Sequence, residues 1–262
     1  IMRAREFLMK DLYSFSRDQK EHDDYYEKAK QAYVRIFDRV GLGAQTYTTF
    51  ASGGMFSKFS HEFQTVTSAG EDTIYLNEAK RIAVNKEVYT DEVLAGLRMK
   101  KSDFVEKKAI EVGNIFGLGT RFSDALGLKF KDEAGNARSP FMGCYGIGPG
   151  RVMGTIVETL SDDKGIVWPE AVAPFKVYLV ALFDEKGEVK EAACELYSKL
   201  SARGIEVLYD DRDTTAGEKF SDADLIGIPW RYVISEKTLA ADSVEVKDRR
   251  TGKVEMKKIA AL

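Results

Sequence analysis

The pattern of apolar and polar positions predicts strands and one long helix in the first part of the chain. From Arg5 to Phe15 large apolar and polar residues nearly alternate, as in a half-buried β-strand, and residues 62–67 alternate again. Between these segments, apolar residues recur at helical spacing from Ala29 to Val40, just before Gly41, a typical residue at a helix C-terminus. A capping box at 16–19 predicts where this helix begins.

The segments that follow are less regular. Residues 43–60 are rich in Thr, Ser and Gly and predict a strand followed by a functional loop. Residues 86–110 are strongly charged, lack a strong core pattern and are interpreted as a connector. Residues 109–120 and 140–147 have the pattern of strands again, and a helix is predicted from Arg151 to about Leu160. An antiparallel sheet with helices, an α+β arrangement, is therefore expected here.

A stretch with two prolines, Asp162 to Pro174, is interpreted as the boundary to a second domain. Beyond it strands and helices alternate, which predicts a βαβαβ unit, and the chain ends in a predicted hairpin around residues 249–252. The expected elements are strand 176–183, helix 186–203, strand 205–209, helix 216–226, strand 231–234 and the hairpin strands 243–247 and 254–258.

Composition adds little about partners. With 262 residues, 44% of them apolar, the chain is long enough for two domains that each bury a core. The net charge of −3 does not indicate a nucleic-acid partner, so RNA contacts would require local basic patches. Cys144 and Cys194 lie far apart, which is typical of a reduced protein. With two histidines and no CxxC pair, zinc is not expected.

No targeting or membrane segment is evident in the sequence. No run approaches the roughly 18 to 20 apolar residues of a membrane span, and the first residues lack the pattern of a signal peptide. We therefore expect no membrane association and a cytoplasmic location.

Three short segments contain candidate chemistry. Arg3 and Arg5, one residue apart on a strand, could hold a polyphosphate, although an edge strand with solvated charges would have the same pattern. Residues 146–151 combine a glycine-rich turn with an arginine before a helix, where anions bind well. A dinucleotide-binding fingerprint would need glycine in place of Arg151, and a Walker A motif would need Gly-Lys-Ser/Thr, so a nicotinamide oxidoreductase is excluded on spacing.

The third segment is His61-Glu62-Phe63-Gln64. It begins like the zinc-protease motif, but Thr65 stands where the second histidine is required, which argues against that class. Two interpretations stay open: His61 or Glu62 contacts a ligand, or the pair makes hydrogen bonds within the sheet.

Six blocks, in the same order along the chain, resemble bacterial-type prolyl-tRNA synthetases of class IIa. Residues 2–15 resemble the second half of motif 2, and residues 142–151 resemble motif 3. The other blocks are residues 60–64 with 70–72, Glu111–Thr120, Gly165–Phe175 and parts of Asp210–Pro229. The resemblance implies part of a class II catalytic core at 1–168, with a short connector at about 74–110 replacing the editing insertion, and an α/β anticodon-binding domain at 169–262.

The activity that the resemblance implies is ATP-dependent activation of L-proline to prolyl-adenylate, followed by transfer to tRNA(Pro). ATP with Mg²⁺, L-proline and tRNA(Pro) are the implied partners, and the full-length enzyme is expected to be a homodimer. The interval between Thr73 and Ile110 is too short for an editing domain, so cis-editing of mischarged alanyl-tRNA is expected to be absent.

The resemblance also implies roles for individual residues in ATP binding. Phe7 would stack on one face of adenine, and Arg151 would cover the other while reaching the terminal phosphate. Arg3 would contact the β- and γ-phosphates, with Arg5 beside it, so Arg3 and Arg151 are the candidate catalytic residues. Glu111 would bind the ribose or Mg²⁺, with Thr120 nearby.

For the amino acid and the tRNA, the implied residues fall into two groups. His61, Asn114, Phe116, Cys144 and Gly146 would line the proline pocket, with Cys144 interpreted as a small buried residue rather than a nucleophile. The candidates for anticodon contact are Arg212, Lys219 and Phe220 at a sheet edge, while Arg231, Lys247, Arg249 and Arg250 could meet backbone phosphates or belong to a solvated hairpin.

Two alternatives remain beside this interpretation. The fold could serve another class IIa amino acid such as threonine, glycine or histidine, against which the blocks 111–120 and 144–148 count. A non-catalytic synthetase-like tRNA-binding or accessory protein would not need Phe7, Glu111 and Arg151 together. Because the sequence begins inside the motif 2 loop, the chain alone is expected to bind ATP poorly and not to aminoacylate.

Overall fold

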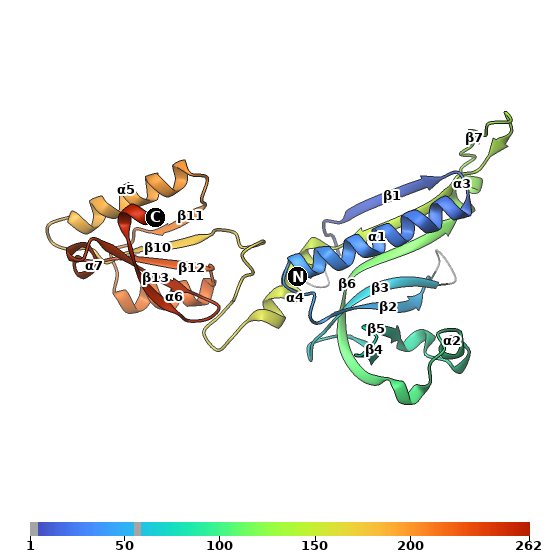
Figure 1. Ribbon diagram of the computed structural model, residues 1–262, viewed down its shortest axis with the longest axis horizontal. Coiled ribbons are helices and arrows are strands. Elements are labelled where there is room, and N and C mark those ends of the chain that lie inside the picture. The colour runs from blue at the N-terminus through green and yellow to red at the C-terminus, as the bar shows by residue number, and fades with distance from the viewer. Residues whose placement is uncertain (1–4, 55–58) are drawn as a thin grey trace. The chain divides into compact units, whose positions relative to one another are not determined.

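The computed structural model describes residues 5–54 and 59–262. Two compact units make up the chain, Ile1–Thr159 and Leu160–Leu262, and each is described by itself (Figure 1). The segment 160–168, which the sequence-based boundary assigned to the first domain, lies in the second unit. Its backbone donates hydrogen bonds to this unit, from Ile166 N to Leu225 O at 3.1 Å and from Trp168 N to Gly227 O at 3.3 Å.

A mixed sheet of seven strands forms the first unit, in the order β1-β9-β6-β3-β2-β5-β4. Its pairs are antiparallel except β2 with β5, and the long strand β6 pairs with β3, β9 and β4. The strands are β1 (Lys10–Ser16), β2 (Thr46–Ser52), β3 (Phe59–Val66), β4 (Asp72–Asn77), β5 (Ile82–Asn85), β6 (Val105–Gly119) and β9 (Phe141–Ile147), with a separate hairpin of β7 (Phe130–Lys131) and β8 (Ala137–Arg138). The helices are α1 (Gln19–Arg39), α2 (Asp91–Gly96), α3 (Arg121–Ala125) and α4 (Pro149–Leu160).

Helix α1 covers one face of this sheet (Figure 1). Its buried Tyr33 and Phe37 pack against Phe63 of β3, with ring centroids 5.0 and 5.4 Å apart. Glycines on β6 allow the close approach, because a Cβ on Gly113 would lie 3.0 Å from the Phe37 ring and one on Gly117 would lie 3.1 Å from His22. The opposite face of β1, β6 and β9 carries the candidate site.

The predicted first strand and helix exist, but both begin later than expected. Strand β1 starts at Lys10, which pairs with Ile147, the last residue of β9. Beyond this pair β9 has no residue left with which the residues before Lys10 could pair. Asp18 caps α1 by accepting from Glu21 N at 2.8 Å, so the predicted capping box at 16–19 is wrong. Gly41, with φ of 84°, follows the helix as predicted.

The charged segment interpreted as a connector folds around its own small core. It follows β5 directly and holds the 3₁₀ turns η1 (Lys86–Val88) and η2 (Lys101–Asp103), α2 and the first residues of β6. Val84, Leu94, Met99 and Phe104 pack together and are buried. The expectation of no strong core was wrong because these apolar residues share no period: Val84 belongs to β5, Leu94 to α2, and Met99 and Phe104 to the residues between elements.

The second unit has the predicted βαβαβ order. Its strand order is β11-β10-β12-β13-β14, with β10 parallel to both β11 and β12 and an antiparallel hairpin at the edge. Helices α5 and α6 cover opposite faces, since Leu179 packs with Leu196 of α5 and Val180 packs with Ala223 of α6. The elements are β10 (Val177–Ala181), α5 (Glu188–Ala202), β11 (Val207–Asp210), α6 (Ala216–Ile226), β12 (Trp230–Ile234), α7 (Glu236–Ala240), which was not predicted, β13 (Ser243–Asp248), β14 (Val254–Lys258) and η3 (Ile259–Ala261).

Candidate active site

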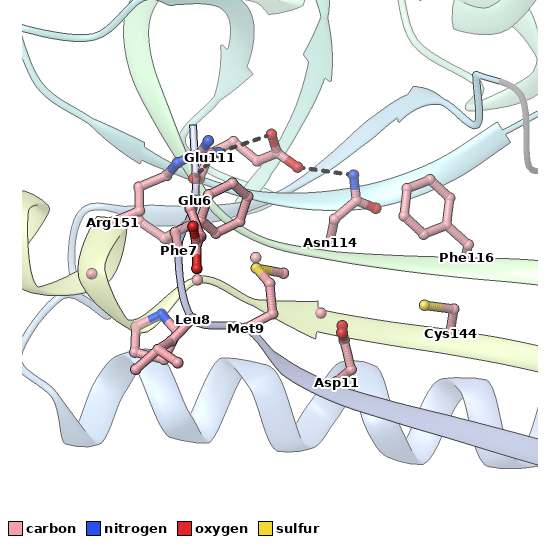
Figure 2. A pocket seen from close by; sticks show the side chains of 16 residues that line it. Glu6, Phe7, Leu8, Met9, Asp11, Glu111, Asn114, Phe116, Cys144 and Arg151 are labelled. Atoms are coloured by element: carbon pink, nitrogen blue, oxygen red, sulfur yellow. Dashed lines mark hydrogen bonds and ion pairs between the residues drawn. The ribbon is translucent and has the colours of Figure 1, made fainter. Parts of the chain in front are cut away.

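A cavity of about 620 Å³ opens on the sheet face of the first unit that lies away from α1. Three segments line it: the residues just before and at the start of β1, the middle of β6, and the turn from β9 into α4 (Figure 2). The structure therefore brings together seven residues that the sequence singled out: Phe7, Glu111, Asn114, Phe116, Cys144, Gly146 and Arg151.

A β-bulge in β6 aims two of these side chains into the cavity. Phe63 pairs with Gly113 and the next residue, Gln64, pairs with Glu111, so Val112 is the extra residue on β6. In a regular strand, Glu111 and Asn114 would point to opposite faces because they are three residues apart. The bulge places both on the cavity side, where Asn114 Nδ2 donates to Glu111 Oε1 at 2.9 Å (Figure 2).

Arg151 meets Glu111 from the first turn of α4. One guanidinium nitrogen, Nη1, donates to the Glu111 carbonyl oxygen at 3.1 Å and to Oε2 of its carboxylate at 3.3 Å (Figure 2). Both side chains are about one-quarter exposed, so the pair is partly shielded from water. An anion that enters this cavity would meet a fixed cation at the start of a helix, where the helix dipole also favours negative charge.

A second layer of polar side chains lies beside Glu111 on the same face of the sheet. Glu62 accepts from Gln64 Nε2 at 2.9 Å and from Asn85 Nδ2 at 3.0 Å, and Gln64 Nε2 also donates to Asp72 at 2.8 Å. Burial, and secondarily the charge of Glu111, raises the pKa of Glu62 to about 7. The like charge of Glu111 therefore disfavours ionisation of Glu62.

Four residues around Phe7 line the cavity although the sequence gave them no role in the site: Glu6, Leu8, Met9 and Asp11. Their only signal was their position around Phe7. Met9 sits over Gly146, where an added Cβ would lie 3.2 Å from Met9 Cε and 3.4 Å from Asp11 Oδ1. A side chain at position 146 would therefore crowd Met9 and Asp11, and glycine leaves this part of the cavity free.

Cys144 lies at the same end of the cavity. Burial is the largest cause that raises the pKa of its thiol above the usual range. A protonated thiol is a poor nucleophile, which favours the interpretation of Cys144 as a lining residue.

The structure does not bring His61 to the cavity. Its side chain lies on the α1 side of β3, where Nδ1 and the Tyr26 hydroxyl are 2.9 Å apart. The Tyr26 hydroxyl also donates to Ile115 O at 3.1 Å. The neighbouring Glu62 is the residue of this motif that faces the cavity side, as alternation along a strand requires.

The buried position of His61 predicts a pH-dependent stability. Burial lowers the pKa of His61 from 6.5 to about 4, so the unfolded chain takes up a proton at higher pH than the folded one. The stabilisation by neutral His61 is complete above about pH 6.5 and is lost as the pH falls to about 4, on the order of 3 kcal/mol in all. Urea unfolding of wild type and His61→Gln at several pH values measures this. A slope between pH 4 and 6.5 that the substitution leaves unchanged would contradict it.

Three other predicted nucleotide contacts lie elsewhere. Thr120 follows β6 at the N-cap position of α3, where its side chain makes no capping hydrogen bond, and it does not line the cavity. Arg5 is exposed just before the lining segment and is not part of the lining. Arg3 lies outside the described residues.

In the second unit, two of the predicted RNA-contacting cations are sequestered. Lys219 is 1% exposed and lies on α6 rather than at a sheet edge, donating to Ala181 O at 2.8 Å and Asp210 O at 3.2 Å. Arg231 stacks on the partly buried Phe220, with its guanidinium carbon 4.2 Å from the ring centroid. Both cations thus stabilise the fold of this unit.

The other basic residues differ in their accessibility. Arg212 is half-exposed and forms hydrogen bonds to Asp210 and Asp222 at 2.7–2.9 Å. Lys247 pairs with Asp224 at 2.7 Å, and Arg249 is buried and holds Asp162 through two hydrogen bonds of 2.7 Å. Arg250 is exposed at the hairpin turn. Among these basic residues, Arg212 and Arg250 are the exposed ones.

Residues 5–54 and 59–262 contain no group of three or more His, Cys, Asp or Glu side chains arranged to hold a metal ion. No helix in the same ranges combines the length and the apolar character needed to cross a membrane.

Comparison with known proteins links both units to one class of enzyme. Residues 1–160 match the family model described as tRNA synthetase class II core domain (G, H, P, S and T), and residues 176–262 match the anticodon binding domain model. A proline–tRNA ligase of Rhizorhabdus wittichii is 40% identical over an alignment that covers 98% of this chain. Proline–tRNA ligases of Wolbachia sp. subsp. Brugia malayi and Rickettsia bellii are each 38% identical over 97% of the chain.

The chain spans less than two-thirds of the length of these relatives, 64% of the first and 62% of the other two. The resemblance that the sequence motifs indicated is confirmed, and so is the expected succession of an α+β core and an α/β anticodon-binding domain. From the family match over residues 1–160, the chain belongs to the class II tRNA synthetase core family of the G, H, P, S and T enzymes.

Proposed function

We propose that the protein is a proline–tRNA ligase, which activates L-proline with ATP and transfers the prolyl group to tRNA(Pro). One observation carries the proposal: Phe7, Glu111 and Arg151 face the same cavity as Asn114, Phe116, Cys144 and Gly146. An aromatic ring, a carboxylate and a fixed arginine suit a nucleotide, and the small neighbouring end suits a compact amino acid.

For the nucleotide, the aromatic ring of Phe7 offers a stacking surface, and Arg151 supplies positive charge for the phosphates. Holding the two reacting anions together and stabilising charge in the transition state is the main task of such a site. Mg²⁺ would neutralise phosphate charge when bound with ATP, and Glu111 is the cavity carboxylate best placed to hold it. Arg3, Arg5 and Thr120 remain predictions for this site.

For the amino acid, the end of the cavity around Cys144 and Gly146 is also lined by Met9 and Phe116, with Asp11 and Asn114 as its polar residues. A small cyclic side chain fits such a lining better than a long or charged one. His61 has no part in this proposal because its side chain packs under α1.

The remaining parts of the proposal concern the whole protein. The match of residues 176–262 to an anticodon-binding domain supports tRNA(Pro) as the second substrate, with Arg212 and Arg250 as the contacts to test first. Homodimerisation, a cytoplasmic location and the lack of cis-editing are further predictions of the same family relationship.

Binding of stable aminoacyl-adenylate analogues tests the proposal directly. Isothermal titration calorimetry should show that a prolyl-sulfamoyl-adenosine binds at least about 100-fold more tightly than the threonyl, glycyl and histidyl analogues. Tighter binding of another analogue would indicate a different synthetase of the class. Binding of none would favour a non-catalytic tRNA-binding protein, which would still bind tRNA.

A further inference from the structure

Three carboxylates share the cavity-side face of the sheet around the bulge. Glu111 holds Asn114 and Arg151, while Glu62 and Asp72 lie on β3 and β4 beside it. Glu62 pairs directly with Asn114 across the strands, and Gln64 pairs with Glu111. Side chains of such pairs lie within about 5 Å of one another at their Cβ atoms. Glu62 is therefore within reach of the same amide that Glu111 uses.

Gln64 stands between these carboxylates. It is fully buried, and its amide nitrogen donates to Glu62 Oε2 at 2.9 Å and to Asp72 Oδ2 at 2.8 Å. Its amide oxygen has no hydrogen-bond partner within the described part of the chain. Turning the amide over would place this oxygen between two carboxylates, so the orientation is fixed by charge. A buried amide that leaves its acceptor unpaired but uses both N–H groups on carboxylates serves mainly as a donor.

We propose that Gln64 is a positioning residue for the nucleotide site. Its two N–H groups occupy Glu62 and Asp72, and this prevents both carboxylates from competing with Glu111 for the Asn114 amide and the Arg151 guanidinium. The inference deepens the proposed function and rests on it, because it matters only if Glu111 and Arg151 bind the nucleotide. Gln64 itself does not line the cavity and touches no substrate.

The variant Gln64→Met removes both donors and keeps a side chain of similar length. Glu62 then loses its stronger donor and is expected to take the Asn114 amide, which turns Glu111 away from its position. The dissociation constant for MgATP, measured by calorimetry, should rise about 10-fold or more. Thr65→Val is the matched control: Thr65 is the next residue on β3, equally buried, and its hydroxyl bonds Thr46 at 2.8 Å. It should lower stability without changing MgATP affinity.

A second substitution separates positioning from simple loss of structure. In the double variant Gln64→Met/Glu62→Gln the competing charge beside Asn114 is gone, so MgATP affinity should return to within about 3-fold of wild type. Wild-type affinity in Gln64→Met alone would overturn the inference and leave the proposed function intact. A weakened Gln64→Met that the second substitution does not rescue would also overturn it, since the residue would then act through packing. All variants are made in the full-length protein, and if its wild type bound no MgATP at millimolar concentration, the proposed function would fail, and the inference with it.

Discussion

Replacing Arg151 by lysine is expected to weaken MgATP binding about 100-fold, or roughly 2.8 kcal/mol. The guanidinium reaches the Glu111 carbonyl and carboxylate together, at 3.1 and 3.3 Å, from the first turn of α4. A lysine ammonium is a point charge without the planar fork, so it cannot hold this carboxylate and cover an adenine face in the same way. Calorimetric titration of the variant with MgATP measures the loss.

Arg138→Lys provides the control for this experiment. Arg138 also pairs with a carboxylate, Asp132 at 2.9 Å, but it lies in the β7–β8 hairpin and does not line the cavity. Its replacement should leave MgATP affinity within about 2-fold, since an exposed ion pair contributes little. An Arg151→Lys variant that binds MgATP as well as Arg138→Lys would show that the cavity is not the nucleotide site.

Gly227→Ala is expected to lower the free energy of unfolding of the second unit by about 2 to 5 kcal/mol. Gly227 ends α6 in the left-handed region, with φ of 78°, and an added Cβ would lie only 1.9 Å from the Ile166 carbonyl oxygen. The segment from Ile166 to Trp168 bonds to this helix end, so it must be displaced. Urea unfolding measures the change, and faster proteolysis near residue 166 should accompany it.

Gly204→Ala separates the two causes of this loss. Gly204 also follows a helix with positive φ, 74°, but a Cβ there would meet no described atom within 4 Å. Only the conformational cost remains, about 1 to 2 kcal/mol. Equal losses in the two variants would mean that the contact with Ile166 does not constrain Gly227.

The motifs in the sequence predicted the main members of the cavity, but not how they meet. Simple alternation along β6 would put Glu111 and Asn114 on opposite faces. The bulge at Val112 brings them to the same face, and no residue pattern in 111–114 predicts this bulge. Alternation along β3 also does not predict whether His61 faces the cavity or α1, because the face that α1 covers depends on where this helix packs. Both features arise from pairing between segments that are distant in sequence.

The basic residues of the second unit show a different limit. Lys219 and Arg231 are the kind of side chain that contacts RNA, yet the structure places them against backbone carbonyls and Phe220. Burial of a lysine depends on acceptors from β10 and β11, which no local pattern around residue 219 reveals. The βαβαβ order of this unit, by contrast, followed from the apolar pattern, whereas the short helix α7 did not.

The central claim, activation of L-proline at this cavity, is tested most directly by amino-acid-dependent exchange of labelled pyrophosphate into ATP. The assay uses the protein as it is expressed from its own gene, with each candidate amino acid in turn. The account predicts exchange that depends on L-proline and is abolished in Arg151→Ala. Exchange that depends on threonine, glycine or histidine instead, or no exchange with any amino acid, would contradict it.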